Sequence, residues 1–463
     1  MPVLSVGDVL QATGGRLAIG DPAARITSYS IDTRRLERGA AFFALVGTRT
    51  DGHAFVSDAA RAGAALAVVS RLPEGTGPFP PAVIHVDDGA AALARCGALA
   101  RQRLNAKVIA LTGSAGKTTT KEFIATGLSA SFRVHRTTGN LNNELGVPLT
   151  LLACPEDAEM AVIEMGMNGP GQIAFLTRLA DPHVGLVTNV RPVHLEFFSS
   201  LDEIAAAKGE LFAVLRADAS AVVNLDDARV RLQAARHDGR RVTFGRSEAA
   251  DLRAETIADR FLPGAGLSFF FEGRSYAVPL QVGGAHAALD ALAAAAAVVA
   301  AGAPLPPALA AMSAMEPAPG RGRITRLPGD VAVVDDTYNS NPEALASVLG
   351  TLAASAPAGR RVLVMGDMLE LGAQAAAFHR AAGERAAASG VALLVAVGPL
   401  SKNAAETARK AGVEVHTADD APAAAKIVPD LVREGDLVVI KGSRGIRLEQ
   451  VVDALLARAG TGA

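Results

Sequence analysis

Apolar runs of strand length alternate with longer helical stretches through most of the chain. The central part begins with the run VIALT after Lys107, which a glycine-rich loop and a helix follow. Further apolar runs lie at Met160–Met165, Val184–Val190 and Ala221–Leu225. Such runs are typical of parallel strands whose two faces are both covered by helices. The pattern therefore predicts an α/β fold with a mostly parallel sheet.

Turn-rich segments divide this pattern into three parts. The loop Arg71–Pro81 and a helical stretch near Gly89–Leu104 precede the central run, and the Pro- and Gly-rich segment Met315–Arg323 ends it. A chain of 463 residues also suits about three domains. We predict a small α/β domain with a linker over residues 1–105, a central domain over 106–316, and a Rossmann-like, doubly wound domain over 317–463.

Two details refine the sheets of the last two domains. Within Gly266–Gln281, two alternating apolar segments flank a turn, which predicts a hairpin and hence an antiparallel edge on the central sheet. In the third domain the apolar runs restart at Val331, Val362, Leu393 and Leu437. This rhythm is the basis for expecting a second parallel sheet.

Charge and hydropathy exclude two classes of partner. The 45 basic and 47 acidic side chains nearly cancel, so the global charge favours neither a nucleic acid nor an anionic membrane surface. The most apolar stretch, Ala287–Ala303, contains Asp290 and Gly302. A membrane span takes about 20 strongly apolar residues, so we expect a packed helix and no membrane insertion.

Cysteine content and the N-terminus suggest a compartment. Cys96 and Cys154 lie in unrelated segments without metal-ligand spacing, which predicts two buried thiols in a reducing environment. The first residues, MPVLSVGDVLQATGG, lack the basic and apolar regions of a secretory signal. We therefore expect a cytoplasmic protein.

The segment VIALTGSAGKTTTKE predicts a phosphate-binding loop. Gly113 and Gly116 allow close approach of the backbone, Lys117 offsets charge on the β- and γ-phosphates, and the Thr118 hydroxyl suits Mg²⁺. The loop also includes Ser114, Ala115 and Thr119. Leu111 stands where the longer form of the pattern has a glycine, so the match is to the shorter form GxxGKT.

Three charged residues downstream stand in positions that suit a site. Glu164 ends the apolar run AVIEM, and His194 follows the run GLVTNV, so both fall at the carboxyl ends of strands, where ligands bind in open α/β sheets. Lys208 lies among alanines on a helical segment. Taken one by one, Glu164 and His194 are equally consistent with satisfied loop residues, and Lys208 with a solvated lysine.

The motifs and their order resemble those of the Mur ligases, which form amide bonds in cell-wall peptides. The resemblance covers nearly the whole chain and rests on SIDTR (30–34), DGHAF (51–55), TGSAGKTT (112–119), TTGNLNNELGVP (137–148), EMGMN (164–168), NVRPVHLEFF (189–198), AKGELF (207–212), GRGR (320–323), DDTYNSNP (335–342), GDMLELG (366–372) and KGSRG (441–445).

The resemblance implies an ATP and Mg²⁺ centre. Thr118 with Glu164 would hold one Mg²⁺, while His194 and Lys208, the latter modified to a carbamate, would hold a second. A carbamate turns a cation into an oxygen ligand, which hard Mg²⁺ prefers. The catalytic residues would be Lys117, Glu164, His194 and Lys208, and further nucleotide contacts would come from Arg323, Asp336, Tyr338 and Asn339.

The resemblance also implies the substrates. A UDP-N-acetylmuramoyl-tripeptide would contact Ser30, Thr33, Arg34, Asp51, Gly52, His53, Thr137, Thr138, Asn142 and Asn143. The TYNSNP segment (337–342) stands in place of the DNPR sequence of relatives that add the third peptide residue, so it favours addition of D-alanyl-D-alanine. The expected reaction activates the tripeptide carboxylate with ATP to an acyl phosphate, which the dipeptide amine attacks. A monomer acting on small molecules is expected.

Other interpretations stay open. The DGH segment is also consistent with a turn that caps a helix, and Asn142 and Asn143 with helix caps. A folylpolyglutamate-type ligase shares the loop but not the combination of Asp51–Phe55 and TYNSNP. A partitioning-type ATPase switch shares GKTTT but normally carries an extra lysine before the glycines, where this chain has Leu111 and Thr112.

The chain departs from the family pattern in several places. The family's GxHN stretch with a later asparagine reads Gly284, Ala285, His286, Ala287 and then Asp290, which puts an adenine contact by a side-chain amide in doubt. Gln172 replaces a usual glutamate, and Arg191 and Phe197 replace smaller residues. None of these changes removes a predicted phosphate or metal ligand.

Overall fold

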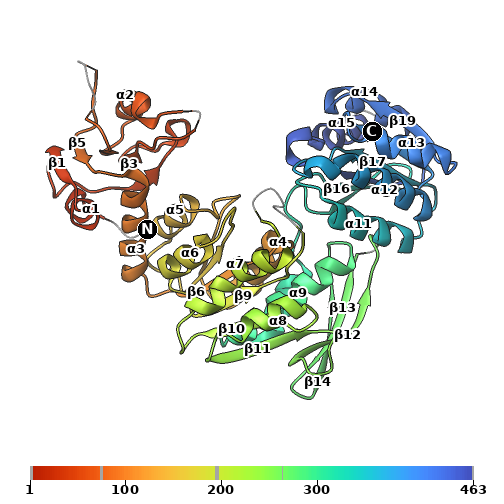
Figure 1. The fold of residues 1–463 in the computed structure, drawn as a ribbon, viewed down its shortest axis with the longest axis horizontal. Helices are drawn as coiled ribbons and strands as arrows, with labels where there is room; N and C mark the ends of the chain where they lie inside the picture. Colours follow the sequence, from red (N-terminus) through yellow and green to blue (C-terminus); the bar gives the residue numbers. More distant parts are fainter. Residues whose placement is uncertain (1–3, 49, 73–76, 193–197, 263, 461–463) are drawn as a thin grey trace.

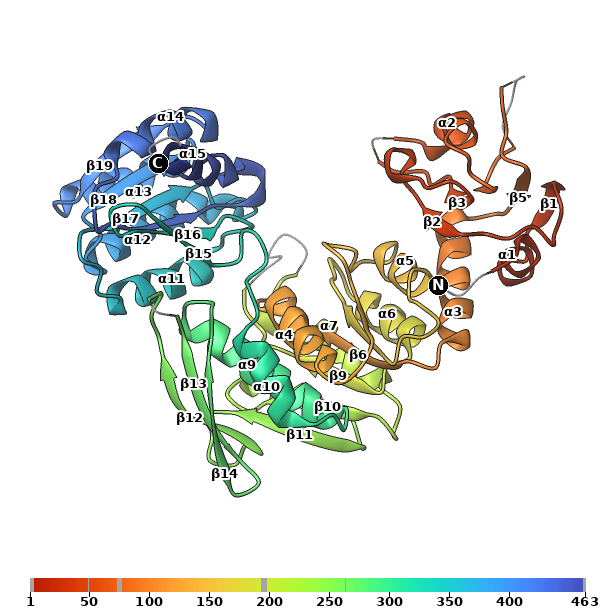
Figure 2. The same ribbon diagram turned by 180° about the vertical axis from the view of Figure 1, so that it is seen from behind.

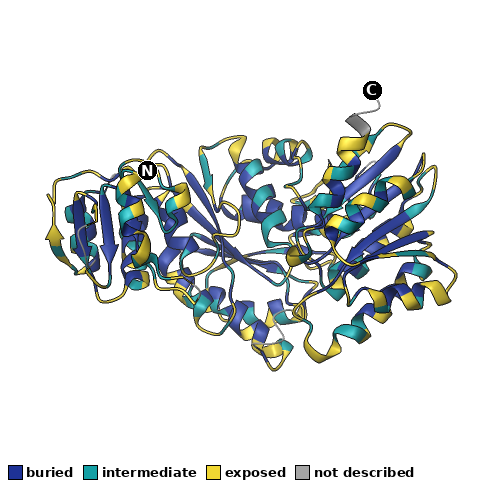
Figure 3. Cartoon of the chain, turned by 90° about the horizontal axis from the view of Figure 1, so that it is seen from above, coloured by how far each residue is buried: buried dark blue, intermediate teal, exposed yellow. Residues whose placement is uncertain are grey.

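The computed structural model describes residues 4–48, 50–72, 77–192, 198–262 and 264–460. Three α/β domains follow one another along the chain, each built on its own sheet. Figures 1 and 2 show the first domain in red and the third in blue at opposite ends of the central domain. Figure 3 shows that the strands of all three sheets are mostly buried. The predicted fold class is confirmed.

The first domain has a five-stranded sheet in the order β1-β5-β4-β3-β2, in which β1 is antiparallel to its neighbour. Phe42 and Phe43 point to opposite faces, as alternation along a strand requires. The elements are α1 (Val6–Thr13), β1 (Arg16–Ile19), β2 (Ser28–Ser30), η1 (Thr33–Arg35), β3 (Ala40–Phe43), η2 (Gly52–Phe55), α2 (Val56–Arg61), β4 (Leu66–Val69), β5 (Ala82–His85) and α3 (Gly89–Arg103).

The central domain has a nine-stranded sheet in the order β14-β13-β12-β11-β10-β9-β6-β8-β7. Its elements are β6 (Lys107–Thr112), α4 (Lys117–Ser129), β7 (Val134–Arg136), α5 (Gly146–Leu152), β8 (Met160–Glu164), α6 (Gln172–Ala180), β9 (Val184–Val187), α7 (Leu201–Val214), β10 (Ser220–Asn224), α8 (Ala228–Ala234), β11 (Arg240–Gly245), β12 (Leu252–Ala258), β13 (Gly266–Phe271), β14 (Arg274–Pro279), α9 (Ala285–Ala300) and α10 (Leu305–Ser313).

Helices cover both faces of this central sheet. Ile109 and Leu111 of β6 pack in one core with α4, α9 and α10, whereas Val108 and Ala110 pack in another with α5, α6, α7 and α8. Strands β6 to β12 are parallel to one another. Strands β13 and β14 form the antiparallel hairpin that the sequence predicted, and β13 pairs antiparallel with β12. The alanine-rich stretch is the packed helix α9, as expected.

The third domain has a six-stranded sheet in the order β15-β16-β20-β17-β18-β19, parallel except at β15. Helices α11, α12 and α13 cover one face, and α14 and α15 cover the other. The elements are β15 (Arg323–Leu327), β16 (Val331–Asp336), α11 (Pro342–Ala354), β17 (Arg361–Gly366), η3 (Gly372–Gln374), α12 (Ala375–Ala388), β18 (Leu393–Val397), α13 (Lys402–Lys410), β19 (Glu414–Ala418), α14 (Ala421–Leu431), β20 (Leu437–Lys441), η4 (Arg444–Ile446) and α15 (Glu449–Gly460).

The central and third domains are also joined away from the covalent link. Phe261, in the connection after β12, is 1% exposed and packs in the core of the third domain. Its N–H donates to the Ser355 hydroxyl at 3.0 Å. Asp259 accepts from the Thr351 hydroxyl at 2.7 Å and from the N–H of Ala285 at 2.9 Å. This contact ties α11 to the first turn of α9.

Two expectations from the sequence concern membrane insertion and the two cysteines. In the part of the chain that the structure describes, no helix has both the length and the apolar character needed to cross a membrane. Cys96 and Cys154 are both buried and free, as predicted. Burial raises the pKa of the Cys96 thiol to about 12 and that of Cys154 to about 11.

Candidate nucleotide and metal site

The phosphate loop joins β6 to α4 at the carboxyl edge of the central sheet. Gly113 and Gly116 adopt φ values of 153° and 79°, which favour glycine. A Cβ at Gly113 would lie 1.9 Å from the Thr188 hydroxyl, so no larger residue fits there. The loop thus needs both glycines, and it brings the N-terminus of α4 to the site where a phosphate would sit.

The connection after β9 holds the loop in shape. Ser114 donates its N–H to the Asn189 carbonyl at 3.0 Å, and Ala115 donates its N–H to the Asn189 side chain at 3.0 Å. Thr188 donates its hydroxyl to the Ala115 carbonyl at 2.7 Å. Because they lie in the first turn of α4, the N–H groups of Lys117, Thr118 and Thr119 have no acceptors within their own helix.

Two lysines converge on one carbonyl of this loop. Lys117 Nζ donates to the Gly113 oxygen at 2.9 Å, and Lys208 Nζ donates to the same oxygen at 3.1 Å. Burial lowers the pKa of Lys117, and the nearby Glu164 carboxylate offsets part of this shift. Burial, together with the charge of Lys117, lowers the pKa of Lys208 well below its ordinary range. Lys208 is 2% exposed, so the interpretation as a solvated lysine is wrong.

Glu164 ends β8 as a buried carboxylate. One oxygen, Oε1, accepts from the Asn142 amide at 2.8 Å and from the Thr118 hydroxyl at 3.4 Å. The other, Oε2, is buried without a hydrogen-bond partner among the described residues, and Lys121 Nζ lies 3.8 Å away. A buried carboxylate oxygen without a partner beside a threonine hydroxyl fits a hard cation.

The rest of the predicted metal centre is less complete. His194 lies outside the described residues. Within the described ranges, no three His, Cys, Asp or Glu side chains gather into a cluster that would hold a metal ion. The structure brings Thr118 and Glu164 together, and it places Lys208 at the Gly113 carbonyl of the phosphate loop.

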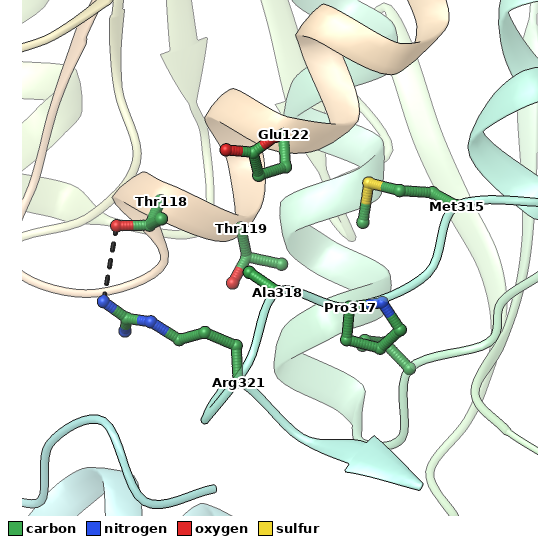
Figure 4. A pocket seen from close by; sticks show the side chains of 8 residues that line it. Thr118, Thr119, Glu122, Met315, Pro317, Ala318 and Arg321 are labelled. Carbon is green, nitrogen blue, oxygen red and sulfur yellow. Dashed lines mark hydrogen bonds between the residues drawn. The ribbon is translucent and has the colours of Figure 1, made fainter. Parts of the chain in front are cut away.

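Arg321 is a residue of this site that the sequence analysis did not select. Its guanidinium donates to the Thr118 hydroxyl at 3.4 Å and lies 3.7 Å from the centre of the Tyr338 ring. Figure 4 shows it across a pocket from the first turns of α4, where Thr118, Thr119 and Glu122 lie. Its Nε is buried without a partner in the described part of the chain.

Arg323, which was predicted to contact the nucleotide, lies two residues further on. It is exposed on β15, and its guanidinium lies 3.8 Å from Glu316. Both arginines belong to the GRGR segment, and no spacing rule distinguishes them. Arg321 lies before β15, in the connection between the central and third domains.

The residues predicted near the nucleotide in the third domain form their own network. Lys441 Nζ donates to Asp336 at 2.6 Å and to the Asn339 carbonyl at 2.9 Å. Tyr338 faces Arg321 on one side, and the Arg444 guanidinium lies 5.8 Å from its ring centre. This arrangement places the end of β16 opposite the phosphate loop.

The four predicted substrate residues after β7 have different surroundings. Thr137 is buried, accepts from the Glu164 N–H at 3.0 Å through its hydroxyl, and accepts from Lys121 through its carbonyl. Asn142 binds Glu164, whereas Asn143 is exposed and its side-chain oxygen accepts from the Gly146 N–H at 2.9 Å, at the start of α5. Thr138 is exposed beside them.

The predicted substrate residues of the first domain lie in two short capped turns. Asp51 caps η2 by accepting from the His53 N–H at 2.9 Å, binds the His53 ring at 2.7 Å and pairs with Arg71. His53 Nε2 accepts from the Ser70 N–H at 3.0 Å. Asp51 therefore does make the cap that the DGH segment allowed.

The second of these turns follows β2. Asp32 caps η1, where Thr33 is the first residue, and its carboxylate binds Arg34 Nε at 2.9 Å. Arg34 lowers the pKa of Asp32 to about 2. Ser30 accepts from the Asp32 N–H at 3.0 Å. Gly52 belongs to the other turn, where a Cβ would lie 2.6 Å from the Leu45 nitrogen.

Three family models match successive parts of the chain. They are the Mur ligase family catalytic domain over residues 25–99, the Mur ligase middle domain over 111–298, and the Mur ligase glutamate ligase domain over 320–444. The matches follow the three sheets in order.

Curated relatives match over nearly their whole length. UDP-N-acetylmuramoyl-tripeptide–D-alanyl-D-alanine ligases of Synechocystis sp. and Escherichia coli are each 36% identical to this chain, covering 94% and 93% of it and 92% and 94% of the relatives. A folylpolyglutamate synthase of Mycobacterium tuberculosis is 20% identical at a TM-score of 0.62, which shows a similar fold alone.

Solved structures agree with these relatives. A crystal structure of MurF from Acinetobacter baumannii has a TM-score of 0.89 and 31% identity, with 99% of both chains covered. The MurF ligase from Thermotoga maritima in complex with ADP has a TM-score of 0.80 and 27% identity over 94% of this chain and 98% of its own. By its sequence, its three domains and its phosphate loop, the chain belongs to the Mur ligase family.

Proposed function

We propose that this chain is an ATP-dependent ligase that joins D-alanyl-D-alanine to UDP-N-acetylmuramoyl-tripeptide and so completes the pentapeptide precursor of peptidoglycan. Relatives that are 36% identical over more than nine-tenths of the chain carry the name of this activity. The TYNSNP segment, rather than DNPR, precedes α11. A folylpolyglutamate ligase or a partitioning-type switch is not favoured, because three Mur ligase models match in order.

The observation that carries this proposal is the meeting of four side chains at the end of the central sheet. Lys117 lies on the phosphate loop, Thr118 and Glu164 face one another, and Arg321 reaches them from the connection to the third domain. Cations fixed around a transferring phosphoryl group stabilise the charge on its oxygens. A site of this kind suits transfer of the γ-phosphoryl group.

The reaction follows from that transfer. The terminal carboxylate of the tripeptide attacks the γ-phosphorus of ATP, the bond to the β-phosphate breaks, and ADP leaves. The amine of D-alanyl-D-alanine then attacks the acyl carbon, loses a proton, and expels inorganic phosphate. Lys117 and Arg321 bind phosphoryl oxygens, and exclusion of water by the third domain would protect the acyl phosphate from hydrolysis.

Among the described residues, Thr118 and Glu164 suit Mg²⁺. Thr118 and Glu164 would hold one ion, and His194 with Lys208 a second; the ions would supply positive charge next to the phosphates. The buried Glu164 Oε2 without a partner supports the first site. The lowered pKa of Lys208 supports a carbamate, since the neutral amine adds to CO₂ and releases a proton.

The remaining assignments complete the proposal. The turns that contain Ser30, Thr33, Arg34, Asp51, Gly52 and His53 would bind the UDP part, and Thr137, Thr138, Asn142 and Asn143 the part nearer the peptide. Asp336, Tyr338, Asn339 and Arg323 would contact the nucleotide. We expect the enzyme to act as a monomer in the cytoplasm.

ADP release tests the proposal directly. Purified protein is given Mg-ATP and UDP-N-acetylmuramoyl-tripeptide, with and without D-alanyl-D-alanine, and the product is identified by its mass. We expect ADP release to depend on the dipeptide and the product to be the pentapeptide. L-alanyl-L-alanine serves as the control acceptor. ADP release that is indifferent to the dipeptide, or that responds to a folate and glutamate instead, would overturn the assignment.

A further inference from the structure

A buried carboxyl group lies directly against the phosphate loop. Asp290, on α9, is 7% exposed. A Cβ at Gly116 would lie 2.2 Å from Asp290 Oδ1 and 2.8 Å from Oδ2, so the carboxyl fills the space that a side chain at Gly116 would need. Because Gly116 is the N-cap of α4, Asp290 lies beneath the turn on which the nucleotide phosphates would be bound.

A negative charge in this place conflicts with a bound nucleotide. The phosphates of ATP and the ionised form of Asp290 would lie on opposite sides of one turn of backbone, and like charges repel strongly where water is excluded. Removing the charge by adding a proton is the usual response of a buried carboxyl that has no cation close enough to pair with it. The neighbours of Asp290 therefore decide its charge.

Among the described residues, few polar groups face this carboxyl. The Thr120 hydroxyl of α4 faces the Asp290 carboxyl, but the two groups do not form a hydrogen bond with good geometry. Arg321, in the connection between the central and third domains, lowers the pKa of Asp290 through its charge. Its guanidinium nevertheless contacts Thr118 and the Tyr338 ring. On the same α4 face, Lys117 donates to Gly113 instead.

A further ionisable group is on the same helix as Asp290. His286 lies one turn earlier on α9, and its ring is 3.4 Å from the Ser347 hydroxyl of α11. None of the named groups makes a close ion pair with Asp290. Burial raises the pKa of Asp290 well above its ordinary range, and Thr120 and Arg321 lower it by less.

We propose that Asp290 is a proton-carrying positioning residue of the phosphate loop, and that the nucleotide is bound by the form of the enzyme in which Asp290 is neutral. This inference rests on the proposed ATP-dependent function. One proton enters from solvent at an Asp290 oxygen for each nucleotide bound to the ionised enzyme. The neutral carboxyl also gains an O–H donor close to Gly116 and Thr120.

The sign of the pH effect follows from linkage. The bound nucleotide favours the protonated carboxyl, so the pKa of Asp290 is higher in the complex than in the free enzyme. Affinity is then full at pH values below the pKa of the free enzyme and falls by up to about tenfold per pH unit as pH rises from there to the pKa of the complex. An uncharged residue at position 290 removes this dependence.

Binding of Mg-ADP between about pH 6 and 9 tests the proposal. The dissociation constant is measured for the wild type, for Asp290→Asn and Asp290→Leu, and for the control Asp202→Asn, which removes an exposed carboxylate elsewhere in the same domain. Titration of the nucleotide and of the lysines is common to all four proteins. We expect the ratio of the wild-type constant to either position-290 variant to rise with pH by up to about tenfold per unit, and the control to follow the wild type.

The outcomes separate two failures. If no protein binds Mg-ADP at any pH, the proposed ATP-dependent function fails. If all bind with parallel pH profiles, the role of Asp290 is wrong and the ligase function stands. Should neither variant fold, the wild type suffices, because its infrared difference spectrum on adding Mg-ADP at the alkaline end should gain a protonated-carboxyl band. Lack of that band would overturn the inference.

Discussion

The phosphate-loop region and the capped turns of the first domain both bring acidic and basic side chains together, but they use them differently. In the turns, each carboxylate has a close partner: Asp51 binds His53, and Asp32 binds Arg34. Around the phosphate loop, two lysines share the carbonyl of Gly113, and one oxygen of Glu164 has no hydrogen-bond partner among the described residues.

This difference separates local stabilisation from preparation for a ligand. A satisfied cap stabilises its own turn and needs nothing else. A buried polar atom without a partner costs about 1–3 kcal/mol, so a fold retains it where a ligand removes that cost. The unsatisfied groups are therefore the better guide to chemistry in this molecule, and four substitutions test the distinction.

Lys117→Ala should have the largest effect. Removing the ammonium takes away a charge that stabilises the transferring phosphoryl group, so turnover should fall by more than about 10³-fold. ADP release in the complete assay measures the loss. Lys402→Ala is the matched control, since Lys402 is exposed and pairs with Asp419 at 3.0 Å. Near-normal ligation by Lys117→Ala would contradict the mechanism.

Arg321→Ala should have the next largest effect. Its guanidinium links the third domain to Thr118, so we expect kcat to fall by about tenfold to a hundredfold with a smaller change in the KM for the dipeptide. Arg326→Ala is the control, because Arg326 is exposed on β15 and pairs with Asp330 at 3.0 Å. Equal losses in the two variants would show that the contact with Thr118 is not the reason.

Asp51→Ala probes the satisfied region. Loss of the cap should destabilise the first domain by about 1 kcal/mol. The KM for the UDP-linked substrate should rise if the turn binds it as proposed, while kcat stays within about twofold of the wild type. Thermal unfolding and steady-state kinetics measure the two effects. A fall in kcat like that of Arg321→Ala would erase the contrast between the regions.

Asp8→Asn should have the smallest effect and depends on pH. Arg103 lowers the pKa of Asp8 to about 2. The depressed pKa means that the pair stabilises the fold above the unfolded-state pKa of about 3.9 and loses this contribution as pH falls towards 2. Because the pair is partly exposed, we expect less than about 1 kcal/mol at neutral pH.

Thermal unfolding at neutral pH and near pH 2.5 measures that contribution. The difference between Asp8→Asn and the wild type should shrink at the acidic value. Asp58→Asn is the control, because its pair with Arg61 is more exposed. A difference that grows on acidification would mean that Asp8 is not held ionised by Arg103.

The sequence predicted the elements that depend on local pattern. The strands at Met160 and Val331, the hairpin after Gly266 and the alanine-rich helix follow from period and turn residues, and the structure confirms them. Short, half-exposed strands such as β15 and β19 were not predicted, because their residues are largely polar and their identity depends on a neighbouring strand. The domain boundaries near residues 105 and 316 stay predictions.

The site was predictable where a residue type is unusual for its position. Glu164 at the end of an apolar run and Lys208 among alanines both lie beside the phosphate loop. Arg321 gave no such signal, because an arginine in a Gly-rich connection is ordinary. Asp290 was noted as a charge in the apolar stretch Ala287–Ala303 and as a departure from the family's asparagine, but not as a neighbour of the phosphate loop. The surroundings of both residues depend on which distant segment they meet.

The sequence by itself therefore determined the three α/β domains, the phosphate loop and the family, because these follow from hydrophobic periodicity and from short motifs. Tertiary structure decided the rest. It placed Arg321 beside Thr118, buried Lys208 beside Lys117, and set Asp290 against Gly116. The physical reason is that charge and desolvation depend on distances between segments far apart in the chain, and no local pattern encodes those distances.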